Sequence, residues 1–171
     1  MYIVMMLIFM IITVEKNMKK YLILLALMLN VGLVYPHCQV PCGIYDDAIR
    51  IITFKEDFAT ISKAMGEIVT LSAKNDPQSI NQLNRWIITK EEHANNIQRV
   101  VTEYFLTQRV KSKNKNYDKH LRFLHEILVG AMKCKQTVDS QNVDKALKSL
   151  DKFVGVYFDD HGLEHLQKMS D

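Results

Sequence analysis

The chain contains little cysteine, no strong excess of either charge and almost no strand pattern. Its three cysteines are an odd number, which excludes a framework in which every cysteine is paired in a disulfide. The 171 residues include 22 lysines and arginines against 19 aspartates and glutamates, a near balance that gives no sign of a nucleic-acid partner. No internal repeat and no second domain can be seen. These features leave one helical domain as the expectation.

Two apolar runs occupy residues 2–14 and 21–35, and neither reaches the roughly 20 residues that comfortably span a bilayer. The second run comes after Lys19-Lys20 and has the form of a secretory signal. Met18 stands directly before this pair and is an alternative translation start. We expect residues 1–36 to be a leader that a protease removes, so that the protein is exported to the periplasm or the exterior. A retained leader that anchors the chain in a membrane is the alternative.

Cleavage before His37 is inferred from the residues on the C-terminal side of that bond, because Val34-Tyr35-Pro36 lacks the small-x-small pattern of a signal peptidase site. The leader carries three lysines and one glutamate, so 19 basic and 18 acidic residues remain after its removal. A chain of this length can bury one core without disulfides. We divide it into a metal-binding hook at 37–45 and a helical domain at 46–171.

Apolar residues in the domain recur with the period of amphipathic helices. Asp76 is a suitable N-cap for a helix that has Pro77 at its first position. The fold expected is all-α, an antiparallel four-helix bundle with a short N-terminal metal-binding hook. The first apolar stripe is Ile51, Phe54, Phe58, Ile61, Met65 and Ile68, and the second is Ile80, Leu83, Ile87, Ala94, Ile97, Val101 and Phe105. The expected helices are about 46–74, 77–109, 117–138, and a fourth that begins at Asp139 or Ser140, continues past Tyr157 and frays beyond Gly162.

The segment after the leader carries the donor groups for a metal ion. If His37 is the first residue, it offers a free amine and an imidazole. Cys38 offers a thiolate and, once deprotonated, its amide nitrogen, and Cys42 offers a second thiolate. Amine, amide and two thiolates form a square plane suited to nickel(II) or copper(II), and the imidazole is left to bind axially. Pro41 and Gly43 favour a turn that brings both sulfurs to one ion.

The pattern His-Cys-x-x-Pro-Cys-Gly-x-Tyr resembles the nickel-binding hook of the nickel superoxide dismutases. A weaker resemblance extends over about residues 37–158, through Glu103-Tyr104-Phe105 and Asp151-Lys152-Phe153. It implies a superoxide dismutase assembled as a homohexamer, with one nickel ion held by the amine, amide and thiolates described above. The residues that match the hook are His37, Cys38, Pro41, Cys42, Gly43 and Tyr45.

The resemblance implies that His37, Cys38 and Cys42 bind the nickel, and that Tyr45 stands near the metal and controls access of small molecules. In the family a Glu on the first helix and an Arg on the second orient the imidazole. The corresponding stretches here are 51–53 and 90–93, and neither partner is present in them. Glu92 and His93 are the candidates to replace them, because a ligating imidazole usually needs such a partner.

The same residues admit other interpretations. Cys38 and Cys42 could form a small disulfide loop in an exported helical protein without catalysis, or contribute to a zinc site. His161-Gly162-Leu163-Glu164-His165 matches an inverted zinc-protease motif, but a solvated helix end is the simpler interpretation. We expect His120 and His125 at the surface and Cys134 to be a half-buried apolar residue without reactivity.

Overall fold

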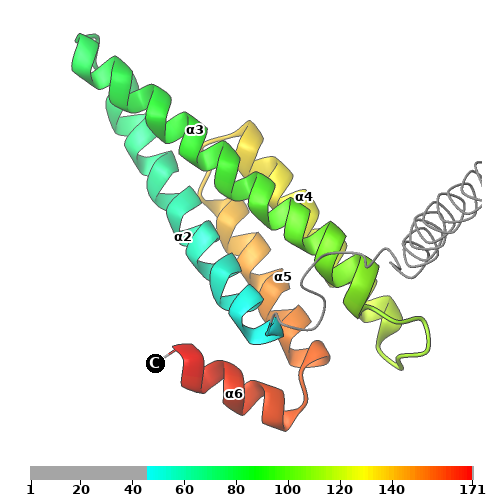
Figure 1. Ribbon diagram of the computed structural model, residues 1–171. Coiled ribbons are helices and arrows are strands. Elements are labelled where there is room, and N and C mark those ends of the chain that lie inside the picture. The colour runs from blue at the N-terminus through cyan, green and yellow to red at the C-terminus, as the bar shows by residue number, and fades with distance from the viewer. Residues whose placement is uncertain (1–45, 171) are drawn as a thin grey trace, which may run out of the picture. The chain divides into compact units, whose positions relative to one another are not determined.

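The computed structural model describes residues 46–170, and every regular element in this range is a helix (Figure 1). The predicted all-α class is confirmed. Among the described helices, none is both long and apolar enough to cross a membrane. The elements are α2 (Asp47–Ser72), α3 (Pro77–Val100), the π-helix η2 (Val101–Arg109), α4 (Tyr117–Gln136), α5 (Gln141–Tyr157) and α6 (Asp160–Ser170).

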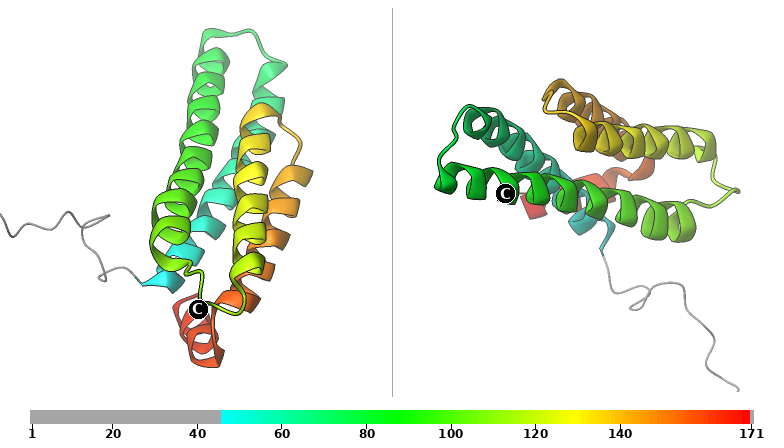
Figure 2. Two further views of the ribbon diagram at one scale, coloured as in Figure 1. Left: turned by 90° about the vertical axis from the view of Figure 1, so that its right-hand side faces the viewer. Right: turned by 90° about the horizontal axis from the view of Figure 1, so that it is seen from above.

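The long helices form two antiparallel pairs around one core, α2 with α3 and α4 with α5 (Figure 2). Helix α6 lies across the end of the pairs at which α2 begins (Figure 1). The α2–α3 hairpin extends past the other pair at the opposite end. Fully buried side chains fill the core, among them Ile51, Phe54, Phe58, Ile61, Ile97, Phe105, Leu124, Ile127, Leu150 and Phe153.

Side-chain caps fix where the first two helices begin. Asp46 accepts a hydrogen bond from the backbone N–H of Ala48 at 2.8 Å and caps α2. Asp76 accepts from the N–H of Ser79 at 3.0 Å, and Pro77 takes the first position of α3, as predicted. The cap at Asp46 also fixes the residue to which the hook is joined, because the hook segment ends directly before it.

The predicted apolar stripes are correct near the centre of the domain and wrong at its projecting end. In α2 the stripe is buried as far as Met65, which is 1% exposed. In α3, Ile97 is buried, whereas Ile80 and Ile87 are 47% and 39% exposed. The cause is that the α2–α3 hairpin extends beyond α4 and α5, so its tip has no second pair to cover it.

The end of the chain differs from the predicted single helix with a frayed end. Helix α5 ends at Tyr157, where Phe158 adopts an extended conformation. A separate helix, α6, then runs from Asp160 to Ser170 and contains Gly162. Leu166 of α6 is only 6% exposed and belongs to the core, so this helix packs on the domain through its own apolar contact.

Two further expectations concern single side chains in α4. His120 is 2% exposed, so its predicted surface position is wrong, whereas His125 is exposed as expected. The core tolerates His120 because its Nε2–H donates to the carbonyl of Val156 at 3.1 Å. Cys134 is fully buried, not half-buried, and burial raises the pKa of its thiol to about 11. It is therefore an unreactive core residue.

Candidate functional site

The predicted ligands His37, Cys38 and Cys42, and Tyr45 beside them, lie outside the described residues. The described chain begins at Asp46, directly after the hook segment 37–45. The described part of the site is the point at which the hook joins the domain. We define the hook base as the two carboxylates at this point and the side chains bound to them: Asp46, Asp47, Tyr104, Arg109, Tyr157 and His165.

Asp47 is the centre of the hook base, because three side chains from two other elements donate to it. Arg109 donates from Nε to Oδ1 of Asp47 at 2.8 Å, and its Nη2 also lies 2.8 Å from this oxygen. The hydroxyl of Tyr104 donates to the same oxygen. Tyr157 donates to the other oxygen at 2.7 Å. Charge-assisted hydrogen bonds of this kind are stronger than neutral ones. The start of α2 is therefore bound both to η2 and to the end of α5.

The π-helix η2 explains how Tyr104 and Arg109 reach one carboxylate. In a π-helix the backbone bonds join residues five apart, and the N–H of Val110 donates to the carbonyl of Phe105 at 2.9 Å. Tyr104 and Arg109 are also five apart, and Nε of Arg109 donates to the Tyr104 hydroxyl at 3.1 Å. The Arg109 guanidinium lies 5.2 Å from the centre of the Tyr104 ring. In an α-helix, which has about 3.6 residues per turn, residues five apart do not lie on the same face.

The electrostatics of the hook base keep both tyrosines protonated at neutral pH. Burial, the hydrogen bond to Asp47 and the charge of Asp47 raise the pKa of Tyr104 to about 12. The same causes, in the same order, raise the pKa of Tyr157. Burial works against the charge of Arg109, but Asp47 outweighs it and raises the pKa of this guanidinium. The base is thus a carboxylate held by one cation and two neutral donors.

Asp46 is held from two sides. Its Oδ1 accepts from the N–H of Ala48 in α2, and its Oδ2 accepts from Nε2–H of His165 in α6. Burial raises the pKa of Asp46, but the hydrogen bonds from His165 and Ala48 lower it by more, so the pKa lies below its ordinary value. Asp46 therefore carries a negative charge at neutral pH and pairs with His165.

Both candidates for orienting the His37 imidazole lie on α3. Glu92 is exposed. His93 donates from Nδ1 to Oδ1 of Asp57 at 2.6 Å, and Asn96 donates to Oδ2 of the same carboxylate at 2.7 Å. Asp57 is 4% exposed, so the pair joins a buried acid of α2 to a half-exposed base of α3. This acid on the first helix is a partner that the sequence did not reveal.

Residues of the zinc-protease pattern make other contacts. His165 binds Asp46, and Glu164 pairs with Lys168 at 2.6 Å. Within residues 46–170, no three or more His, Cys, Asp or Glu side chains are grouped so that they could hold a metal ion. The predicted metal ligands belong to the hook, outside this range.

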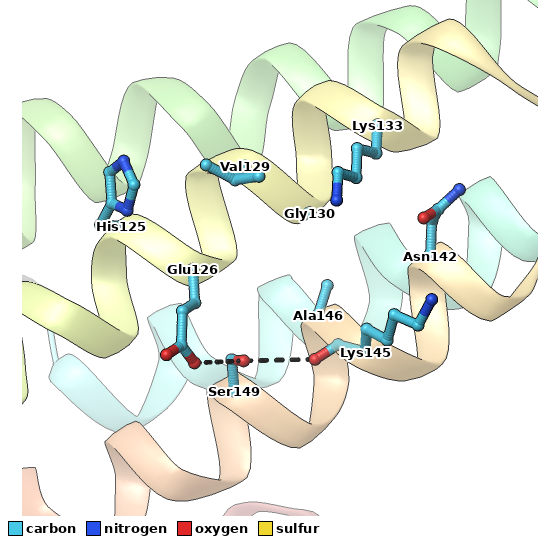
Figure 3. Close-up of a pocket in the computed structure, with 9 residues that line it drawn as sticks. All are labelled: His125, Glu126, Val129, Gly130, Lys133, Asn142, Lys145, Ala146 and Ser149. Atoms are coloured by element: carbon cyan, nitrogen blue, oxygen red, sulfur yellow. Dashed lines mark hydrogen bonds between the residues drawn. The ribbon is translucent and has the colours of Figure 1, made fainter.

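A groove of about 320 Å³ lies between α4 and α5 (Figure 3), and no residue of the hook base lines it. The two helices approach closely here, because a Cβ on Gly130 would come within 2.6 Å of the Ala146 Cβ. Glu126 accepts a hydrogen bond from Ser149 across the groove at 2.8 Å. Two lysines, Lys133 and Lys145, stand at its other end.

Sequence reasoning missed most of the hook base. Tyr104 was named only within a weak family resemblance and His165 only within the zinc-protease pattern, and Asp47, Arg109 and Tyr157 received no functional role. These residues are far apart along the chain, and no short pattern joins them. The one available signal was the pair of acids directly after the hook, because two adjacent carboxylates at the start of a helix attract donors from other elements.

Comparisons with known proteins bear directly on the hook. A model of the family described as nickel-containing superoxide dismutase matches residues 33–161, which is most of the chain. The match begins before His37 and ends at the second residue of α6. No curated protein and no solved structure matches the chain.

Proposed function

Because the chain belongs to the nickel-containing superoxide dismutases, we propose that His37, Cys38 and Cys42 hold its nickel ion and that Tyr45 controls the access of small molecules to it. The chain converts superoxide to oxygen and hydrogen peroxide, and its cofactor is nickel. The observation that carries the assignment is that the family match includes the whole nine-residue pattern. The disulfide-loop alternative has no comparable support.

The donor set of the hook fits this metal. Two thiolates, an amine and a deprotonated amide favour a planar ion over the tetrahedral geometry of zinc. When bound there, nickel supplies the one-electron chemistry, alternating between the +3 and +2 states as two superoxides and two protons become oxygen and hydrogen peroxide. The thiolates and the amide of Cys38 are electron-rich, so they would lower the potential needed to oxidise nickel(II) to nickel(III). His37 would hold the nickel through both its terminal amine and its imidazole.

We assign the orientation of that imidazole to His93, with Asp57 as its anchor. The pair joins an acid of α2 to a base of α3, which is the combination that the family resemblance implies for this task. A ligating imidazole needs a fixed partner at its second nitrogen. Asp57 is buried and holds His93 at 2.6 Å, so His93 has a defined direction in which to present its ring.

The proposal also includes export and assembly. Removal of residues 1–36 by a protease releases the His37 amine in the periplasm or the exterior. The helical domain that follows the hook is a four-helix bundle, and the mature chains assemble as a homohexamer. Exposed apolar side chains on the α2–α3 tip support assembly, with exposed fractions between 39% and 56% at Val69, Ile80, Ile87 and Ile88. Native mass spectrometry tests the assembly, and a monomer at micromolar concentration would contradict it.

The terminal amine offers the sharpest test of the hook. Adding one Ala before His37 in the mature protein keeps every side chain but converts the amine into a peptide nitrogen, a poor donor at neutral pH. We expect this extended protein to lose superoxide consumption. His37→Ala retains an amine and both thiolates, so it should still take up nickel but turn over far more slowly. If the extended protein is as active as the mature form, the amine is not a ligand and the assignment is wrong.

A further inference from the structure

Helix α6 is almost entirely outside the family match, yet it contacts Asp46, the residue directly after the hook. The match ends at residue 161, and α6 spans Asp160–Ser170. Leu166 anchors the helix in the core, and α6 packs against α2 beside its first turn (Figure 1). The helix therefore adds a contact at the hook base that the matched part of the chain does not supply.

The contact is made by one polar side chain, His165. A carboxylate can only accept, so Nε2 of His165 carries the hydrogen that Asp46 Oδ2 receives. The other oxygen of Asp46 is already occupied by the N–H of Ala48. The carboxylate is thus fixed to α2 and to α6 at once, and its residue has an extended backbone with φ −80° and ψ 130°. Both helices therefore hold the residue to which the hook is joined.

We propose that α6 is a clasp on the nickel hook and that His165 is a positioning residue that acts through Asp46. The proposal rests on the assignment of nickel to the hook. Four donors at one ion require a defined geometry of the hook, and a fixed attachment point at Asp46 reduces the conformational freedom that binding costs. The clasp therefore slows release of nickel and fixes the geometry of the ligands, although His165 touches neither metal nor substrate.

The test compares His165→Ala with His161→Ala in the nickel-loaded enzyme. His161 is an exposed histidine of the same helix, so it controls for loss of an imidazole. The side chains of His165 and Asp46 are 43% and 34% exposed, so we expect release of nickel to a chelator to accelerate only about three- to tenfold. The electron paramagnetic resonance spectrum of the nickel centre should change as well. His161→Ala should leave both unchanged. His165→Gln keeps a donor, so its rate of nickel release should lie between those of the wild type and His165→Ala.

Two more variants separate positioning from simple stability. Asp46→Ser keeps an N-cap but is too short to reach α6, so it should match His165→Ala, and the double variant should release nickel no faster than either. If His165→Ala behaves as the wild type, or if the double variant releases nickel faster than either single variant, the clasp is refuted. A wild-type protein that takes up no nickel would instead overturn the hook assignment, and the clasp with it.

Discussion

Replacing Asp47 by Ala should destabilise the domain more than any other change of a partly exposed acid in its helices. The carboxylate accepts from Arg109, Tyr104 and Tyr157, and its side chain is 20% exposed. Hydrogen bonds to a charged group contribute about 1.5–3 kcal/mol each. The three share one carboxylate and are partly screened, so their contributions are not additive. We expect a total loss of about 2–4 kcal/mol in the free energy of unfolding.

Asp118→Ala is the matched control for this prediction. Asp118 is an exposed acid in the first turn of α4, as Asp47 is an acid in the first turn of α2. Its removal loses only the favourable interaction with the helix dipole, about 0.3–1 kcal/mol. The difference between the two variants therefore isolates the contacts of Asp47 with η2 and α5.

Thermal unfolding of the metal-free protein, followed by circular dichroism at pH 7, measures this difference. For a domain of this size the loss at Asp47 corresponds to a fall in Tm of roughly 6–15 °C. Nickel content after loading gives a second readout, since a loosened hook base should hold the metal less tightly. If Asp47→Ala and Asp118→Ala have the same Tm within error, the carboxylate is not the centre of the hook base and our reasoning is refuted.

The hook and the packing of the helices lead to further predictions. Cys38→Ser and Cys42→Ser should each abolish superoxide consumption without changing helix content by circular dichroism; a collapsed fold would make these cysteines structural. His93→Gln should lower turnover while nickel content by elemental analysis stays near one ion per chain. Stability should fall between pH 10 and 12, because a tyrosine pKa raised to about 12 stabilises the fold fully below pH 10 and no longer above 12, and Tyr104→Phe should flatten that part of the denaturation profile. Gly66→Ala should stabilise α2 by about 0.5–1 kcal/mol, whereas Gly130→Ala should destabilise by about 1–3 kcal/mol because its Cβ would meet Ala146; equal shifts in denaturation midpoint would contradict this.

The sequence was sufficient to predict the features that depend on residues close together along the chain. The spacing of Ile51, Phe54 and Phe58 predicts one buried face of a helix, and all three are fully buried. The pair Asp76-Pro77 predicts a helix start, and its cap is present. The hook pattern is also local, and the family match that supports nickel and superoxide dismutation includes it. Each of these signals lies within a few turns of chain.

The sequence was insufficient where contacts join distant segments. Asp47 is 62 residues from Arg109 and 110 from Tyr157, and hydrophobic periodicity contains no information about such pairs. The π-helix was missed for a related reason, since a stripe with a period near 3.6 does not distinguish bonds five apart from bonds four apart. The burial of His120 depends on a carbonyl of α5, which no property of α4 alone could indicate.

These distant contacts meet at two adjacent residues, and this has a consequence for how metal and fold depend on each other. Asp46 is bound by α6, and Asp47 is bound by η2 and α5, so three elements fix the two residues directly after the hook. A ligand that binds only the folded form stabilises it through mass action. Nickel bound at 37–45 should therefore stabilise the domain, and the size of this stabilisation should depend on the contacts of the hook base. Variants of the base should weaken this coupling even though none of them removes a ligand, whereas a cysteine variant should remove the metal and leave the base intact.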